Sequence, residues 1–362
     1  MQSQAQPAPR VHEGLEGVLA AATRLSLVDG ERGELIVAGK RLEELAGRPF
    51  EHTVALLWKA AGASGAAPVR AAALPDLTLA LLRDAAAAGA GSMDALRMAI
   101  GTLTAAEDAE AAHLLVGSCP TIVATHARLA AGSEPLAPRP DLGFAANYLY
   151  MLSGAEPHPE QVRGLDTYLN TVADHGLNAS TFTARTIVST GADFVSAVTG
   201  AVGALKGPLH GGAPGPALDM VFEIGEASRA DRYLRRKLER GERLMGFGHR
   251  IYKVRDPRAD VLEAAAARMF ARTGDARLYE LARAVEAAAL RLLEEHKPGR
   301  RLATNVEFYT ALLLHGLGLD TALFTPTFAI GRMAGWTAHC FEQRASGRLI
   351  RPQSVYVGAL PA

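Results

Sequence analysis

Two histidines of this sequence stand in glycine-rich segments, where a side chain could act on a bound molecule. His210 lies in GALKGPLHGGAPGP, and His249 lies in MGFGHRIYKVRDPRAD. Glycine lets the backbone approach another group closely. The first segment lacks the GxxxxGK[ST] pattern of a Walker A loop, so it does not predict a nucleotide-binding P-loop. A histidine in a loop can also be an ordinary surface residue, and for His210 alone the two interpretations are evenly balanced.

The segment after His249 is strongly basic. Arg250, Lys253, Arg255 and Arg258 fall within nine residues, directly before a predicted helix. Basic side chains are unfavourable at a helix N-terminus, because the helix dipole is positive there. Bound phosphates or carboxylates would compensate, and arginine suits bidentate recognition of a carboxylate. The pattern therefore favours an anion-binding site over a purely structural turn.

A third candidate group is Glu307 in TNVEFYTALLLHGLG. Thr304 stands three residues earlier, which is also the spacing of a helix capping box, and a capping glutamate would turn back to the backbone and be unavailable for chemistry. From the residues alone the capping interpretation is the stronger one.

Three further polar residues have both a functional and a structural interpretation. His175, in VADHGLNASTFTAR, ends a predicted helix and could simply complement the helix dipole. Arg332 lies among apolar residues in FTPTFAIGRMAGWTAHCFEQR, and a buried guanidinium must find an anion in the protein or in a ligand. Arg351, in GRLIRPQSVYVG, alone would be a solvated charge in a C-terminal loop.

The elements that must position these residues are mostly helices. TRLSLVDGERGELIVAG alternates apolar and polar residues around a turn, which predicts a β-hairpin and the only sheet. From Arg41 onward, helical periodicity dominates. Helices are predicted to begin at Pro159, near Pro257 and at Thr325, and the last of these runs to Gly347.

Composition narrows the possible partners. The 38 basic and 38 acidic residues balance, which disfavours binding to nucleic acid or to an anionic membrane. The two cysteines, Cys119 and Cys340, are too few for a disulfide framework or a structural zinc site and fit a reducing compartment. Residues 1–14 read as a disordered tail without a targeting signal, and no later run is apolar enough to cross a bilayer. We therefore expect a cytoplasmic protein.

The ordered set DHGLNAST, GPLHGG, MGFGHRIYKVRDPR, NVEFY, FAIGR and RP resembles the citrate synthase family over nearly the whole chain after the tail. The resemblance implies a mainly α, two-domain helical fold with a small N-terminal β-hairpin, in a homodimer. It implies a large helical domain of residues 15–212 and 309–362 and a small one of residues 213–308, with the active site in the cleft between them. It implies no tightly bound cofactor and no metal, with a coenzyme A thioester as substrate.

The resemblance also assigns roles to individual residues. His210 would stabilise the enolate of the acyl thioester, Glu307 would remove the proton from its methyl group, and His249 would polarise the 2-oxo group of oxaloacetate. His175, Arg258 and Arg332 would bind oxaloacetate, together with Arg351 from the neighbouring subunit. The coenzyme A contacts would be Arg243, Leu244, Met245, Gly246, Phe247 and Lys253.

One departure from the family pattern concerns the base. The family usually has Asp where this chain has Glu307, and the extra methylene moves the carboxylate by about 1.5 Å. The expected function is a citrate synthase that condenses acetyl-CoA with oxaloacetate and hydrolyses the citryl thioester. Two alternatives stay open: a 2-methylcitrate synthase that uses propionyl-CoA, and a non-catalytic coenzyme A-binding protein that retains the fold.

Overall fold

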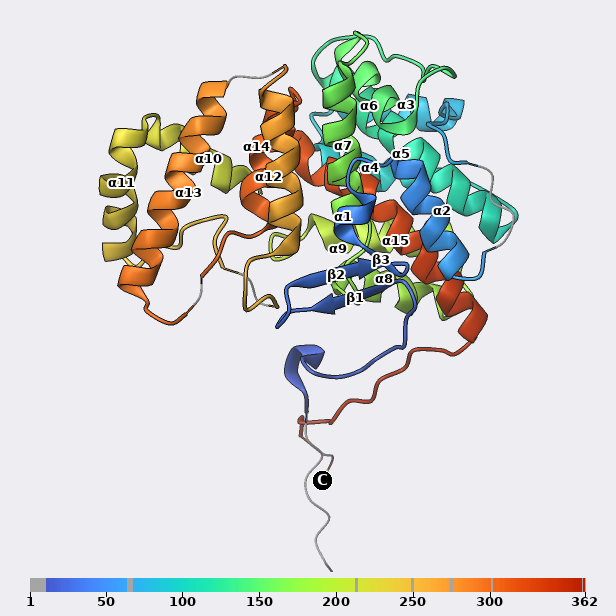
Figure 1. Ribbon diagram of the computed structural model, residues 1–362. Coiled ribbons are helices and arrows are strands. Elements are labelled where there is room, and N and C mark those ends of the chain that lie inside the picture. Colours follow the sequence, from blue (N-terminus) through green and yellow to red (C-terminus); the bar gives the residue numbers. More distant parts are fainter. Residues whose placement is uncertain are drawn as a thin grey trace, which may run out of the picture.

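The computed structural model describes residues 11–63, 68–211, 214–248, 251–273, 276–300, 302–359 and 361. Most of these residues are helical, as the sequence predicts (Figure 1). Most of the predicted tail, residues 1–14, lies outside the described residues, and the part that is described enters a short 3-10 helix, η1, at Glu13–Leu15.

The predicted β-hairpin is present and is slightly larger than expected. Strands β1 (Ser26–Asp29) and β2 (Glu34–Val37) pair antiparallel, with Ser26 opposite Val37. The buried side chains of β2 are Leu35 and Val37, in the alternation that a half-buried strand requires. A short third strand, β3 (Lys40–Arg41), extends the sheet, which is the only one among the described residues.

The other regular elements are helices, which loops connect. In chain order they are α1 (Leu42–Leu45), α2 (Phe50–Ala60), α3 (Asp76–Ala87), α4 (Ser92–Ile100), α5 (Asp108–Ala130), α6 (Phe144–Ser153), α7 (Pro159–Val172), α8 (Ala179–Val188), α9 (Phe194–Lys206), α10 (Pro214–Ile224), α11 (Ala227–Glu239), α12 (Pro257–Phe270), α13 (Ala276–His296), α14 (Val306–Gly316), the 3-10 helix η2 (Thr321–Leu323) and α15 (Phe324–Ser346).

The predicted helix ends at proline and glycine are confirmed. Helices α7 and α12 each begin with a proline, whose missing N–H is no loss in the first turn. Asp256 caps α12 by accepting the backbone N–H of Arg258. Helix α15 begins within two residues of the predicted start and ends at Gly347, which has φ +64° in the left-handed region that glycine tolerates.

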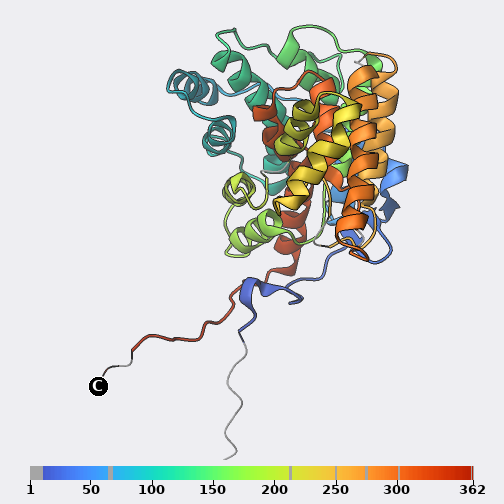
Figure 2. The same cartoon turned by 90° about the vertical axis from the view of Figure 1, so that its left-hand side faces the viewer.

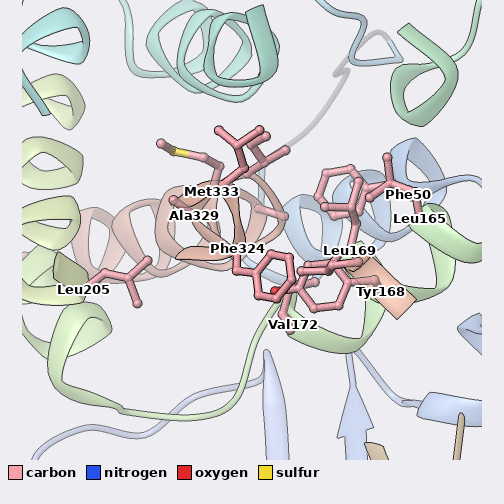
Figure 3. Close-up of a cluster of buried hydrophobic side chains, with 14 of the residues drawn as sticks. Phe50, Leu165, Tyr168, Leu169, Val172, Leu205, Phe324, Ala329 and Met333 are labelled. Atoms are coloured by element: carbon pink, nitrogen blue, oxygen red, sulfur yellow. The ribbon is translucent and has the colours of Figure 1, made fainter. Parts of the chain in front are cut away.

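Helix α15 runs through the hydrophobic core and is buried along most of its length. Figure 3 shows its side chains Phe324, Ala329 and Met333 near residues of α7 and α9. Two glycines bring α15 against the end of α7: a Cβ atom at Gly331 would lie 2.6 Å from the side chain of Val172, and one at Gly335 would lie 2.4 Å from the Ala173 carbonyl oxygen. This close packing sets Arg332 beside the loop that follows α7.

Helices α10 to α14 lie together on one side of the molecule (Figure 1). The hairpin and the remaining helices lie on the opposite side. Helix α12 packs against both α7 and α14. The division into a large and a small domain stays a prediction, and its boundary after Phe308 would fall inside α14.

The C-terminal segment after Ser346 leaves the helical body as an extended chain in both views (Figures 1 and 2). No helix in the described ranges is long and apolar enough to span a membrane.

Candidate active site

Five of the predicted site residues line one cavity of about 220 Å³. They come from five different parts of the chain: the loop after α7, the turn after α9, the first turns of α12 and α14, and the middle of α15. Aromatic and aliphatic side chains complete the wall. The full lining is Tyr168, Val172, His175, Asn178, His210, Gly211, Ile251, Arg258, Val306, Glu307, Thr310, Phe328 and Arg332.

A larger cavity of about 440 Å³ lies between α5, α6, α7 and the end of α14, but it contains none of the predicted residues. Assignment of the site therefore rests on the chemistry of the lining and not on size. Among the described residues, no group of three or more His, Cys, Asp or Glu side chains is arranged to hold a metal ion.

His210 is held by a short chain of side-chain hydrogen bonds. Its Nε2 lies 2.8 Å from the hydroxyl of Ser180, which also accepts the indole N–H of Trp336 at 3.1 Å. The Ser180 hydroxyl donates to Asn178 Oδ1, also at 2.8 Å. A hydroxyl has one proton to donate. While Ser180 donates this proton to Asn178, Nε2 of neutral His210 carries the imidazole proton and donates to Ser180. If Ser180 turns to donate to Nε2 instead, neutral His210 carries its own proton on Nδ1.

The surroundings keep His210 uncharged. Burial, and then the positive charge of Arg332, lower the pKa of His210 to about 4. At neutral pH this imidazole is therefore uncharged, and in the tautomer with its proton on Nδ1 it can donate a hydrogen bond to an enolate oxygen.

Arg332 is 2% exposed and lacks a carboxylate partner within the described ranges. Its Nε donates to the Val172 carbonyl oxygen at 2.6 Å, and its guanidinium carbon lies 4.8 Å from the centre of the Phe328 ring. Burial lowers the pKa of Arg332 to about 10, despite the nearby charge of Asp174. A buried guanidinium without an ion-pair partner is suited to bind an anionic ligand.

Arg258 has a different environment, because Asp256 forms two hydrogen bonds with it. The distances are 3.0 Å from Nε to Oδ1 and 2.8 Å from Nη2 to Oδ2. Asp256 Oδ2 also accepts the backbone N–H of Val306 at 3.2 Å, which joins the start of α12 to the start of α14. The second cation of the cavity is thus held in a fixed position close to Glu307.

Glu307 does not form the capping box that its spacing from Thr304 suggests. The N-cap of α14 is Asn305, whose side chain accepts the backbone N–H of Glu307 at 2.9 Å. The Thr304 hydroxyl instead donates to Glu286 on α13, at 2.6 Å. The capping interpretation is therefore wrong, because the Thr304 hydroxyl is hydrogen-bonded to the buried carboxylate of Glu286.

The carboxylate of Glu307 faces the cavity with its pKa raised by burial. Arg258 works in the opposite direction and lowers that pKa, while the charge of Asp256 raises it further. In the part of the chain that the structure describes, the carboxylate accepts no hydrogen bond. Such a group is a stronger base than an exposed glutamate when it is ionised.

The predicted coenzyme A segment lines a second cavity, of about 420 Å³. Arg243, Leu244 and Phe247 contribute to its wall, beside the acidic Glu242. Lys297 and Arg300, from the segment after α13, complete the charged part of the wall. Three cationic side chains around one cavity are suited to phosphate groups.

Backbone hydrogen bonds join this segment to the residues before Glu307. Asn305 N–H donates to the Gly246 carbonyl at 2.9 Å, and Gly248 N–H donates to the Ala303 carbonyl at 2.7 Å. Gly246 has φ +86°, and a Cβ atom there would lie 2.9 Å from Phe308, so glycine is required. The coenzyme A segment and the base are therefore parts of one connected structure.

The remaining predicted residues lie elsewhere. His249 falls outside the described residues. Met245 is half-buried and Lys253 is exposed, and neither lines either of these two cavities. Arg351 is exposed, on the segment that follows α15, and is not among the residues that line the cavity.

Several residues of the site were not identified from the sequence. Ser180 and Asn178 belong to DHGLNAST, but Asn178 there has the ordinary pattern of a helix N-cap, and it does cap α8. Lys297 and Arg300 belong to the basic run HKPGRR, which could have been paired with the coenzyme A segment as a second phosphate-binding segment.

Sequence comparison relates the chain to known proteins over most of its length. Residues 14–353 match the family model described as citrate synthase, C-terminal domain. The chain is 40% identical to citrate synthase 2 of Bacillus subtilis (strain 168), over 95% of each chain. It is 38% identical to citrate synthase of Haloferax volcanii, also over 95% of each chain.

Solved structures have the same fold. Citrate synthase from Pyrobaculum aerophilum superposes with a TM-score of 0.87 at 34% identity, covering 99% of this chain and 95% of that chain. The ternary complex of carboxymethyl coenzyme A and oxaloacetate with citrate synthase from Thermoplasma acidophilum superposes with a TM-score of 0.83 at 27% identity, covering 98% of this chain and 97% of that chain.

Proposed function

This chain belongs to the citrate synthase family, and on that premise we propose that His210, His249 and Glu307 carry out the condensation of acetyl-CoA with oxaloacetate. The observation that carries the proposal is the shared cavity, in which a neutral imidazole, a carboxylate with a raised pKa and two arginines face one space. These are the groups that the reaction needs: a donor for an enolate, a base for a carbon acid and cations for two carboxylates.

The chemistry divides into three steps. Glu307 takes a proton from the methyl group of acetyl-CoA, and the N–H of His210 stabilises the enolate oxygen that forms. The methylene carbon then bonds to the 2-oxo carbon of oxaloacetate, and His249 gives a proton to the resulting alkoxide. Water finally cleaves the citryl thioester to release citrate and coenzyme A.

Oxaloacetate brings two carboxylates to the cavity. Arg332, whose guanidinium lacks a carboxylate partner among the described residues, supports one carboxylate position. Arg258, oriented by Asp256, and His175 support the second. The phosphates of coenzyme A would lie in the cationic cavity beside Arg243.

Release of free thiol in the presence of oxaloacetate and acetyl-CoA or propionyl-CoA tests this function. We expect thiol release with acetyl-CoA at the higher kcat/KM. A higher kcat/KM with propionyl-CoA would indicate 2-methylcitrate synthesis instead, since one methylene is worth about 1–3 kcal/mol in a hydrophobic pocket. No thiol with either substrate would refute the proposed activity.

We further propose that the active unit is a homodimer in which Arg351 reaches the neighbouring cavity. The support is its exposed position on a segment that leaves its own chain's body. The test mixes two inactive variants, Arg351→Ala and His210→Ala, under conditions of subunit exchange. Each mixed dimer would contain one intact site, so about a quarter of the wild-type sites should return in an equal mixture. No recovery, with mixed dimers demonstrated by mass spectrometry, would contradict a shared site.

The proposed location is the cytoplasm. Cys119 and Cys340 are both buried and unpaired, which is compatible with a reducing compartment. Fractionation of cells that make the tagged protein would test the location.

A further inference from the structure

We propose that the N-terminal hairpin positions the oxaloacetate site, with Ser26 fixing the loop that carries His175 and Gly30 fixing the loop that carries Tyr252. Ser26 is in β1, and Gly30 is in the turn between β1 and β2. Neither residue lines the cavity, so both would act through the residues that do. The inference rests on the proposed role of His175 in binding oxaloacetate.

Ser26 contacts the residues on both sides of His175. Its hydroxyl donates to Asp174 Oδ2 at 2.6 Å and accepts the backbone N–H of Gly176 at 2.8 Å. Asp174 is fully buried, and its Oδ1 lies 3.2 Å from Nε2 of His339 in α15. The position of His175 is therefore set from one side by α15 and from the other by the hairpin.

Gly30 contacts the loop that contributes Ile251 to the cavity wall. Its carbonyl oxygen accepts the backbone N–H of Lys253 at 2.8 Å. A Cβ atom at Gly30 would lie 2.3 Å from the Ile251 carbonyl oxygen and 2.9 Å from the Ile251 carbonyl carbon, and both are backbone atoms. Figure 1 shows the hairpin tip next to the loop that leads into α12. An alanine at this position must therefore push the loop away.

The two loops also contact each other across the site. His175 Nε2 lies 3.1 Å from the hydroxyl of Tyr252, the residue before Lys253. The hairpin thus contacts both loops, and the two loops contact each other. Because a shift of about 1 Å in a binding group can cost about a hundredfold in rate, a hairpin that fixes both loops controls the geometry of the oxaloacetate site.

The test measures oxaloacetate binding directly, by isothermal titration calorimetry on the full-length protein, together with KM for both substrates. We expect Ser26→Ala to raise the Kd and KM for oxaloacetate about tenfold and to leave the KM for acetyl-CoA within about twofold. Ser26→Thr keeps the hydroxyl and should restore the Kd. Gly30→Ala should raise the Kd for oxaloacetate at least as much as Ser26→Ala.

Glu31→Ala is the matched control, because its side chain is exposed in the same turn. It should leave the Kd within about twofold of wild type. A purely structural role for the hairpin would lower the melting temperature without changing the Kd of the folded fraction.

A wild-type Kd in both Ser26→Ala and Gly30→Ala overturns the proposal. His175→Ala separates this inference from the proposed function. If His175→Ala weakens oxaloacetate binding and the two hairpin variants do not, only the positioning role fails. If His175→Ala has no effect on binding, the assignment of His175 fails and the inference fails with it.

Discussion

Replacing Glu307 with glutamine should lower the rate of catalysis without lowering the stability of the fold at neutral pH. Glutamine has nearly the same size but is not a base, and loss of a positioned general base costs about 10²–10⁴ in rate. We expect kcat to fall by that factor. The KM for oxaloacetate should change much less, because Arg332 and Arg258 remain in the cavity.

The stability argument follows from the pKa of the same group. Burial raises the pKa of Glu307 in the folded protein, although Arg258 opposes the change. A carboxyl group with a raised folded pKa stabilises the fold at low pH, and this contribution is lost as the pH rises through the folded pKa. At neutral pH the buried carboxylate therefore opposes folding. Glu307→Gln removes this charge, so the Tm at pH 7 should stay the same or rise.

The assay combines thiol release at saturating substrates with calorimetric unfolding at pH 7 and at pH 4, below the ordinary glutamate pKa of 4.5. The Tm difference between wild type and variant should shrink at the lower pH. Glu280→Gln, an exposed substitution on α13, is the control and should change neither quantity. If Glu307→Gln retains more than about a tenth of wild-type kcat, the assignment of the base is wrong. A large fall in Tm at pH 7 would refute the electrostatic reasoning.

Three further predictions concern the surroundings of the cavity. Ser180→Ala removes the partner of His210 and should lower kcat about tenfold or more, measured by thiol release. The control is Ser196→Ala, at an exposed position in the first turn of α9. Because the pKa of His210 is lowered to about 4, the folded protein should lose stability as the pH falls from 6.5 towards 4, and His210→Gln should reduce that loss in pH-dependent unfolding. Arg300→Ala should raise the KM for acetyl-CoA several-fold and make it less dependent on salt, with the KM for oxaloacetate as the internal control.

Local signals in the sequence predicted the helices well. The starts of α7 and α12 and the end of α15 depend on proline or glycine at one position, and the physical effect of these residues acts within one turn. The hairpin was predictable for the same reason, because alternation and turn residues lie within one short segment.

The capping box predicted between Thr304 and Glu307 is absent because a residue distant in sequence binds the threonine. Its spacing from Glu307 fits a capping box, but its hydroxyl bonds to Glu286, and only the placement of α13 beside α11 and α12 brings that carboxylate near. The bonds from Ser180 to His210 and from Asp174 to His339 are of the same kind. Each joins residues that no periodicity relates, so the arrangement of the site requires the three-dimensional fold.

The backbone bonds between Gly246, Gly248 and the residues before Glu307 bear on how the enzyme could be redesigned. A bulkier acyl group would need extra room near the base. The segment predicted to bind coenzyme A cannot move away from the base independently, because backbone hydrogen bonds join it to the residues before α14. A variant that accepts a larger acyl group would therefore need smaller side chains in the cavity wall, for example in place of Val306 or Phe328. Replacing residues 243–248 by another loop would instead displace the carboxylate of Glu307 and lower kcat with every substrate.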